Sequence, residues 1–256
     1  MRPKLFFLLL LLQISFLSLA QKPDNTELEN FNQFFGKERA ATLEDAVDSF
    51  DRFIQVNYAE FENSTEQIEA FLKQITQYNE AQDSWILETE RNSKIIESFE
   101  STGLRKEIWT YGYEDYESKH DFNEVLLPAV PDTTPIRELG DLALDLMEEE
   151  IIVPLRKVDP VEQERLEKER EARRLNSLQS NYQGDYVFAL LKYSPKESFV
   201  YEFTESKYAA GVDISMAILA GAYLYSEVNY NDPLVKRLLV TDFYFWVMNW
   251  DVNRKG

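Results

Sequence analysis

The stretch LVKRLLVTDFYFWVMNW, residues 234–250, decides the fold class that the sequence predicts. Apolar residues occupy nearly every position around a helix with this sequence. A helix that is apolar on all sides is buried on all sides. Asp232 followed by Pro233 is a typical helix start, because the carboxylate caps free amides and proline needs no hydrogen-bond acceptor. We therefore predict a central helix here, and the charges at Lys236, Arg237 and Asp242 argue against a membrane span.

The preceding stretch ISMAILAGAYLYSEV, residues 214–228, is also apolar nearly all round. Asp213 stands at the position of a helix cap, which predicts a helix start directly after it. The small residues Ala217, Ala220, Gly221 and Ala222 predict that a neighbouring helix approaches closely. This stretch is the second predicted central helix.

Further amphipathic helices are predicted earlier in the chain. Residues 42–61 repeat apolar side chains at steps of three and four, with Thr42 as the expected cap, and Ser64 begins a second such run. A third pattern stops at Gly103. The chain has only eight glycines and nine prolines, which favours long helices with short joints. The predicted class is all-α, a multi-helix bundle or irregular helical array, with a small β-hairpin as an option within residues 186–203.

The sequence divides into segments of different composition. PAVPDTTP, residues 128–135, cannot be regular helix because of its prolines. The predicted organisation is listed here in chain order: a signal peptide at 1–20, an N-terminal helical lobe at 21–128, a Pro-rich boundary and connecting helix at 129–158, a charged solvated helix at 159–180, and a C-terminal apolar helical lobe at 181–256. We expect the two lobes to form one domain.

The charged helix has Pro160 at its first position and a thin apolar stripe. Acids and bases follow one another at four-residue spacing, which stabilises an exposed helix by a few tenths of a kcal/mol per pair. Heptads fail within two repeats, so a solvated helix that bridges the lobes is the preferred interpretation. A protruding arm that recruits a partner is the alternative.

The first residues have the layout of a secretory signal peptide, with basic Arg2 and Lys4, an apolar run, and cleavage expected after Ala20. Cleavage removes two positive charges and no acid, so the net charge of −19 becomes −21. Such a surface repels phosphate backbones, which excludes nucleic acid as a partner. With no cysteine to form disulfides, a periplasmic or secreted bacterial location is favoured. We expect the mature chain to be soluble, without a stable membrane span.

IWTYGYEDYESKHDF, residues 108–122, contains the only histidine of the chain. Steps of four, three and four would place four candidate ligand-binding residues on one helical face if Gly112 does not break the helix: Trp109, Tyr113, Tyr116 and His120. The spacing Glu117-x-x-His120 is used by di-iron bundles, but these need a second histidine. Zinc prefers nitrogen and sulfur ligands. We therefore predict no metal site and no cofactor, and packing or hydrogen bonding as the main role of His120.

The sequence contains few of the residue motifs that are typical of enzymes. It has no G-x-S-x-G elbow, phosphate loop, dinucleotide fingerprint or calcium loop. Paired carboxylates remain, and Glu114, Asp115 and Glu117 are the candidates for a carboxylate-dependent hydrolase of extracytoplasmic glycans. No residue is assigned as catalytic, and these three acids are candidates only.

The favoured function is that of an exported, non-enzymatic protein that binds an unknown protein partner or small-molecule ligand through a groove between its lobes. The glycan hydrolase is the first alternative. A structural subunit that assembles through the charged helix is the second.

Overall fold

The computed structural model describes residues 26–77, 84–126, 160–211 and 214–254. The predicted signal peptide, the Pro-rich boundary and the helix expected after it lie outside these ranges, as does Asp213.

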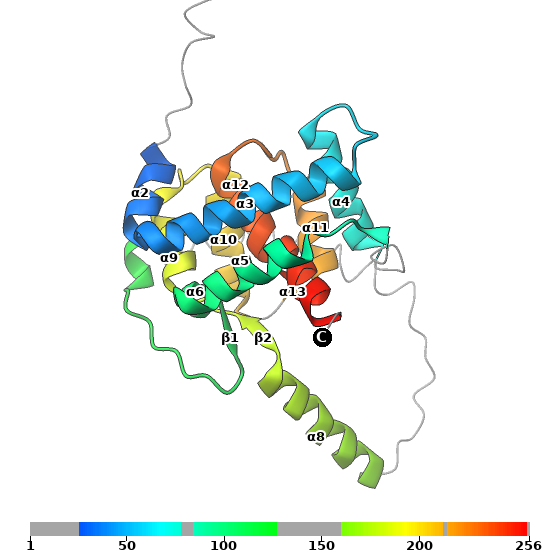
Figure 1. Ribbon diagram of the computed structural model, residues 1–256. Coiled ribbons are helices and arrows are strands. Elements are labelled where there is room, and N and C mark those ends of the chain that lie inside the picture. The colour runs from blue at the N-terminus through cyan, green and yellow to red at the C-terminus, as the bar shows by residue number, and fades with distance from the viewer. Residues whose placement is uncertain (1–25, 78–83, 127–159, 212–213, 255–256) are drawn as a thin grey trace, which may run out of the picture.

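The described chain consists of helices, one small sheet and the segments that connect them (Figure 1). The first part contains α2 (Thr26–Phe35), α3 (Lys37–Asn57), α4 (Ser64–Thr76), α5 (Thr89–Ser101), α6 (Leu104–Ile108), β1 (Trp109–Tyr111) and the 3-10 turn η2 (Phe122–Glu124). The second part contains α8 (Pro160–Asn176), β2 (Leu178–Ser180), α9 (Asp185–Tyr193), α10 (Phe199–Ala210), α11 (Met216–Tyr225), α12 (Pro233–Leu239), the π-helix η3 (Val240–Tyr244) and α13 (Phe245–Arg254). The all-α class is confirmed.

The small β element lies elsewhere than predicted. Strands β1 and β2 pair antiparallel, with Trp109 opposite Ser180 and Tyr111 opposite Leu178. The hairpin expected within residues 186–203 is wrong, because α9 and α10 occupy that region. The hydroxyl of Ser198 accepts a hydrogen bond from the Tyr201 amide and caps α10. The alternating Tyr201 and Phe203 belong to a helical face that also buries Val200 and Thr204.

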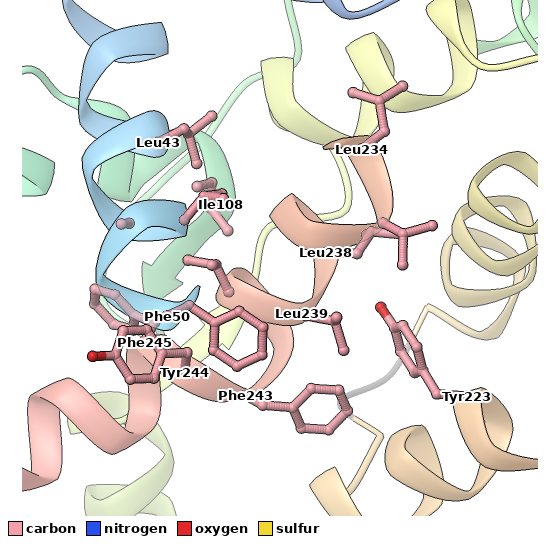
Figure 2. Close-up of a cluster of buried hydrophobic side chains, with 14 of the residues drawn as sticks. Leu43, Phe50, Ile108, Tyr223, Leu234, Leu238, Leu239, Phe243, Tyr244 and Phe245 are labelled. Atoms are coloured by element: carbon pink, nitrogen blue, oxygen red, sulfur yellow. The ribbon is translucent and has the colours of Figure 1, made fainter. Parts of the chain in front are cut away.

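The C-terminal run α12–η3–α13 is the centre of the molecule, as predicted. Figure 2 shows its side chains between Leu43 and Phe50 of α3 on one side and Tyr223 of α11 on the other. Phe243, Leu239 and Met248 are completely buried. The start of this run is also as predicted, because Asp232 accepts a hydrogen bond from the Leu234 amide and Pro233 opens the helix.

The caps of three other helices differ from the predicted positions by one to six residues. Helix α3 begins at Lys37, so Thr42 lies inside it, where its hydroxyl donates to the Glu38 carbonyl oxygen. The cap of α4 is Asn63, one residue before the predicted Ser64. The cap of α11 is Ser215 rather than Asp213. The side chains of Asn63 and Ser215 accept hydrogen bonds from main-chain amides of the first turn, whereas α3 has no side-chain cap at Gly36.

Both predicted lobes contribute to one main core. Helix α11 packs against α4, α13 against α5, and α2 against α9. The main cluster of buried apolar residues accordingly runs from Phe31 to Met248 and includes both sequence halves. The two halves of the sequence therefore share the main apolar core.

The close approach predicted for α11 is realised only in part. Ala220 and Ala222 are buried, and α11 as a whole packs against α4. A Cβ atom added at Gly221 would meet nothing within 4 Å, so that glycine is not required by packing.

Helix α8 begins at Pro160, as predicted, and extends away from the body beyond β2 (Figure 1). Its described side chains are exposed apart from the half-buried Leu166 and Leu175. Arg165 and Glu169 form an ion pair at four-residue spacing. Within the described ranges, no helix combines the length and the apolar character needed to cross a membrane.

Candidate functional site

The residues after β1 do not continue as a helix, so the predicted helical face from Trp109 to His120 is wrong. Strand β1 and the turn that follows it take the place of the expected helix, and Gly112 in this turn lies against the C-terminal end of α8. A Cβ atom there would stand 2.8 Å from the Arg174 carbonyl oxygen and 3.0 Å from the Leu175 Cα atom. This close contact with α8 requires glycine at position 112. After Tyr111 the chain forms a turn instead of a helix.

Side chains of residues 113–121, called segment 113–121 below, alternate between solvent and the body. The outward residues are Tyr113, Asp115, Glu117, Lys119 and Asp121, which are exposed, and the inward residues are Glu114, Tyr116, Ser118 and His120, which are partly buried. This is the side-chain pattern of an extended strand. From Asp115 to Lys119, no main-chain group forms a hydrogen bond with another main-chain group of the described residues.

The first inward residue, Glu114, is held by Arg105. The guanidinium donates to both carboxylate oxygens, at 2.5 and 2.8 Å. The Tyr111 amide donates to the same carboxylate at 2.9 Å, and Lys106 lies 3.3 Å away. The hydrogen bond from Arg105, more than any other contact, lowers the pKa of Glu114 to about 2. Glu114 is therefore an ion-pair partner that holds the start of the segment.

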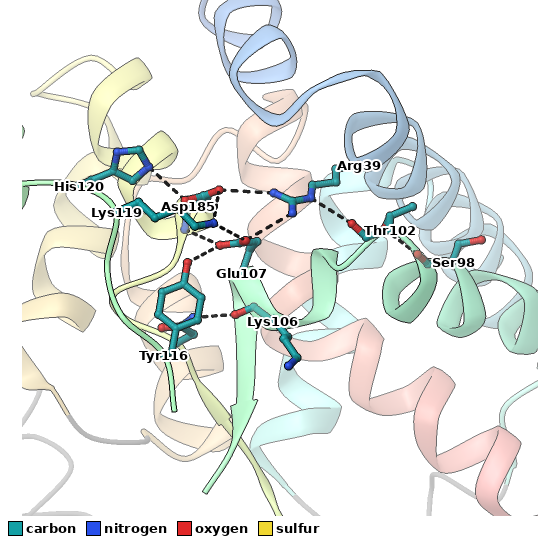
Figure 3. A network of polar contacts seen from close by, with 10 residues as sticks. Arg39, Ser98, Thr102, Lys106, Glu107, Tyr116, Lys119, His120 and Asp185 are labelled. Atoms are coloured by element: carbon teal, nitrogen blue, oxygen red, sulfur yellow. Dashed lines mark hydrogen bonds and ion pairs between the residues drawn. The ribbon is translucent and has the colours of Figure 1, made fainter. Parts of the chain in front are cut away.

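The second inward residue, Tyr116, belongs to a larger set of polar contacts that we call the Glu107 cluster (Figure 3). Its members are Arg39, Glu107, Tyr116, Lys119, His120 and Asp185. The hydroxyl of Tyr116 donates to the buried carboxylate of Glu107 at 2.5 Å. The main-chain amide of Asp185 donates to the same carboxylate oxygen at 3.1 Å.

Cations complete the Glu107 cluster. Lys119 lies 3.3 Å from one oxygen of Glu107, and Arg39 lies 3.5 Å from the same oxygen. Burial by itself would raise the pKa of Glu107, but the contacts with Tyr116, Asp185, Lys119 and Arg39 outweigh it and lower this pKa overall. Burial and the hydrogen bond to Glu107 raise the pKa of Tyr116. The carboxylate is thus charged and satisfied inside the body.

His120 holds the end of the segment. Its Nε2 atom lies 3.1 Å from a carboxylate oxygen of Asp185, and its ring stacks on Phe188 with centroids 4.1 Å apart. Arg39 links the same aspartate to the Thr102 carbonyl oxygen of the α5 end. The structure therefore places His120 in a packing and hydrogen-bonding environment.

The other predicted ligand-binding residues are separated by the turn after β1. Trp109 is 3% exposed and stacks on Phe245 with centroids 4.0 Å apart, so its ring belongs to the core. Tyr113 is 62% exposed and stacks on Tyr111, whose ring also lies under Arg105. Of the four candidates, Tyr116 and His120 meet in one cluster, Tyr113 faces solvent and Trp109 does not reach the surface.

The three candidate acids of the hydrolase alternative do not converge. Asp115 and Glu117 point to solvent, whereas Glu114 points to Arg105. A glycosidase needs one carboxylic acid with a raised pKa to protonate the leaving group. The pKa of Glu114 is lowered, which is opposite to that requirement.

Sequence reasoning missed the three residues that organise the Glu107 cluster: Arg39, Glu107 and Asp185. They come from α3, α6 and the first position of α9. No short motif contains them, and Arg39 and Asp185 are separated by 146 residues. Only the packing of α6 and α2 against α9 places them together.

A second polar cluster lies inside the core. Lys207 forms an ion pair of 2.5 Å with Asp242 of the π-helix, and Tyr223 donates to the other oxygen of Asp242 at 3.1 Å. Burial, followed by the charge of Asp242, raises the pKa of Tyr223 well above its usual range. Beside this pair is a cavity of about 30 Å³, room for about one water molecule.

Comparisons with known proteins found no similar protein: no family model matches the chain, and no curated protein or solved structure is significantly similar to it.

Proposed function

We propose that this chain is an exported, non-enzymatic binding protein and that segment 113–121 is the surface that contacts its partner. The observation that carries the proposal is the alternation within the segment. The inward Glu114, Tyr116 and His120 make polar contacts with the body, whereas the outward Tyr113, Asp115 and Glu117 are exposed.

Preorganisation is the physical argument. A surface segment outside helices and sheets loses conformational entropy when it binds, and this loss weakens binding. Here Arg105 and the Glu107 cluster hold the segment in one conformation before any partner arrives. Binding residues occur often on loops positioned by a rigid scaffold. The strong fixation of an irregular segment therefore supports a recognition role.

The outward side chains indicate the chemistry of the partner. Tyr113 offers a large exposed ring, and tyrosine is enriched among residues that contribute most to protein interfaces. Asp115 and Glu117 are exposed acids in a chain of net charge −19. A protein partner with a positively charged contact surface is complementary to this arrangement.

The export part of the proposal is supported by the predicted signal peptide. Expression of the full chain in a bacterial host should yield an exported protein whose N-terminus is Gln21. N-terminal sequencing of the protein recovered from the periplasm or medium measures this directly. Retention of residues 1–20 in the cell-associated protein would contradict it.

Site-specific photo-crosslinking tests the surface. A photoreactive amino acid at position 113 should give a discrete adduct in the exported fraction, and mass spectrometry of the adduct identifies the partner. The same amino acid at position 225 is the matched control, because Tyr225 is also an exposed tyrosine, at 76%. Equal adducts at both positions, or none at position 113, would refute the assignment of the surface.

The charged helix supports a second candidate function, assembly through α8. The helix projects from the body and its described side chains are solvent-exposed or half-buried (Figure 1). If α8 joins copies of the chain, Leu166→Glu should lower the molar mass measured by light scattering. An unchanged monomer before and after the substitution would eliminate this candidate.

A further inference from the structure

The loop between α3 and α4 contains a modification motif that is remote in sequence from segment 113–121. Asn63, Ser64 and Thr65 form the sequence N-x-T, and no other N-x-S or N-x-T occurs in the chain. With a residue other than proline in the middle, this sequence is an acceptor for N-linked glycosylation in exported proteins. The motif is meaningful where the asparagine lies in an accessible surface loop.

The structure places the motif in such a loop. Residues 59–64 are exposed without interruption. Contacts with the first turn of α4 hold the loop in place. The Glu62 amide donates to a carboxylate oxygen of Glu66 at 3.3 Å. The Nε2 atom of Gln67 donates to the Phe61 carbonyl oxygen at 3.3 Å. The surface around the motif is therefore open to a modifying enzyme and to a bulky glycan.

The way in which Asn63 caps α4 is compatible with a glycan. Its Oδ1 atom accepts a hydrogen bond from the Glu66 amide at 3.0 Å. Its Nδ2 atom, which would carry the sugar, makes no hydrogen bond with the described residues. A glycosylated asparagine keeps its amide oxygen, so the cap is preserved. The helix start and the glycan therefore use different atoms of the same side chain.

Phe61 is an independent observation that points to a sugar. It lies two residues before Asn63, and it is the only exposed phenylalanine among the described residues. The chain bends at each residue from 61 to 63, so the two side chains are not forced to opposite sides as they would be in a strand. Sugars have an apolar face of C–H groups that packs on aromatic rings, and this contact removes apolar surface from water. A glycan on Asn63 would cover the exposed ring.

We propose that Asn63 carries an N-linked glycan whose first sugar packs on the ring of Phe61. The co-reactant is an oligosaccharide linked to a lipid diphosphate. A bond forms between Nδ2 and the anomeric carbon of the first sugar, and the bond from that carbon to the diphosphate oxygen breaks. The lipid diphosphate leaves with the electron pair, and Nδ2 gives up one proton.

This inference rests on the export part of the proposed function and not on the role of segment 113–121. The absence of cysteine favoured a bacterial location. The glycosylation motif and its geometry favour an export route that contains an oligosaccharyltransferase, as the eukaryotic secretory route does.

Secretion of the full chain from eukaryotic cells tests the attachment. The secreted protein should begin at Gln21 and carry a glycan that peptide N-glycosidase removes, which leaves an aspartate at position 63 in the peptide map. Thr65→Ala destroys the motif but keeps Asn63 as the cap, so this variant should be secreted without a glycan. A secreted chain with an unmodified Asn63 would overturn the inference and leave the export proposal intact. A chain retained in the cell with residues 1–20 still attached would overturn both.

Comparison with the same mature chain from a bacterial host, which lacks the glycan, tests the packing on Phe61. The glycosylated protein should have a thermal midpoint about 2 °C higher or more. Phe61→Ala should abolish this difference, because the sugar loses the ring on which it packs. Tyr225→Ala is the matched control, since Tyr225 is an exposed ring at the end of α11, and it should preserve the difference. A difference that survives Phe61→Ala would refute the contact between the sugar and the ring.

Discussion

The central run of residues 233–254 and segment 113–121 both contain aromatic rings, but different forces hold them in place. Phe243 and Tyr244 of the run are buried among the side chains of α3, α4 and α11. Segment 113–121 makes its main contacts through carboxylates, a phenol and an imidazole. Aromatic rings therefore occur in two regions that are stabilised in different ways. Removing apolar volume should disturb the first region, and removing charge should disturb the second.

The largest effect is expected in the central run. Phe243→Ala should lower the free energy of unfolding by about 3–5 kcal/mol, because the cavity adds to the lost burial of a completely buried ring. Urea unfolding followed by circular dichroism measures this change. Phe61→Ala is the control, since Phe61 is 36% exposed and its removal should cost under about 1 kcal/mol. If both substitutions lowered the free energy of unfolding by similar amounts, the distinction between a buried core and an exposed surface would be wrong.

Glu107→Gln should have the next largest effect, about 1–3 kcal/mol, because it leaves Arg39 and Lys119 without their buried carboxylate partner. Its destabilisation should shrink in concentrated salt, which screens the contacts of the exposed Lys119. The destabilisation by Phe243→Ala should not shrink in this way. The control is Glu124→Gln, an exposed acid next to the same region. A cost for Glu107→Gln no larger than that of the control would mean that the Glu107 cluster does not hold the segment.

Acid should destabilise the segment through Glu114. Its pKa is lowered from 4.5 to about 2 in the folded chain, so its contribution is fully present above pH 4.5 and is lost as the pH falls toward 2. The thermal midpoint measured between pH 7 and pH 3 should therefore fall less steeply for Glu114→Gln than for the unmodified protein. The thermal midpoint of Phe243→Ala should fall with decreasing pH as steeply as that of the unmodified protein. Parallel curves for Glu114→Gln and the unmodified protein would contradict this account.

The smallest effect on stability is expected for the outward acids. Asp115→Asn together with Glu117→Gln should change the free energy of unfolding by less than about 0.5 kcal/mol, since both side chains are exposed. The same double variant should reduce the crosslinked adduct formed from position 113. A large loss of stability would show that these acids hold the segment rather than meet a partner.

Helix boundaries were predicted best where a single residue caps the helix or adopts a backbone conformation that ends it. Asp232 and Pro233 start α12 as predicted, and Gly103 ends the α5 region in a left-handed conformation at φ 70°. The hairpin within residues 186–203 failed because an alternating pair such as Tyr201 and Phe203 also fits a helix once Ser198 caps it. Short apolar runs can fit either the period of a helix or the period of a strand, and tertiary packing decides which of the two forms.

The candidate residues were predicted less completely than the helices. Tyr116 and His120 belong to one polar cluster, as their common face suggested, but the helix that was to bring them together does not form. Their partners Glu107 and Asp185 carry no local sequence signal.

Local patterns were enough to predict the helical class, the burial of the C-terminal run and the negative charge of the protein. These properties depend on composition and on side chains three or four positions apart, which a helix brings together wherever it lies. Tertiary packing decided the state of each acid: Glu114 beside Arg105, Glu107 buried beneath Tyr116, and Asp115 in solvent. The energy of a charge depends on burial and on partners within a few ångströms. Several of those partners, such as Asp185 for His120, come from distant parts of the chain and meet only when the helices pack.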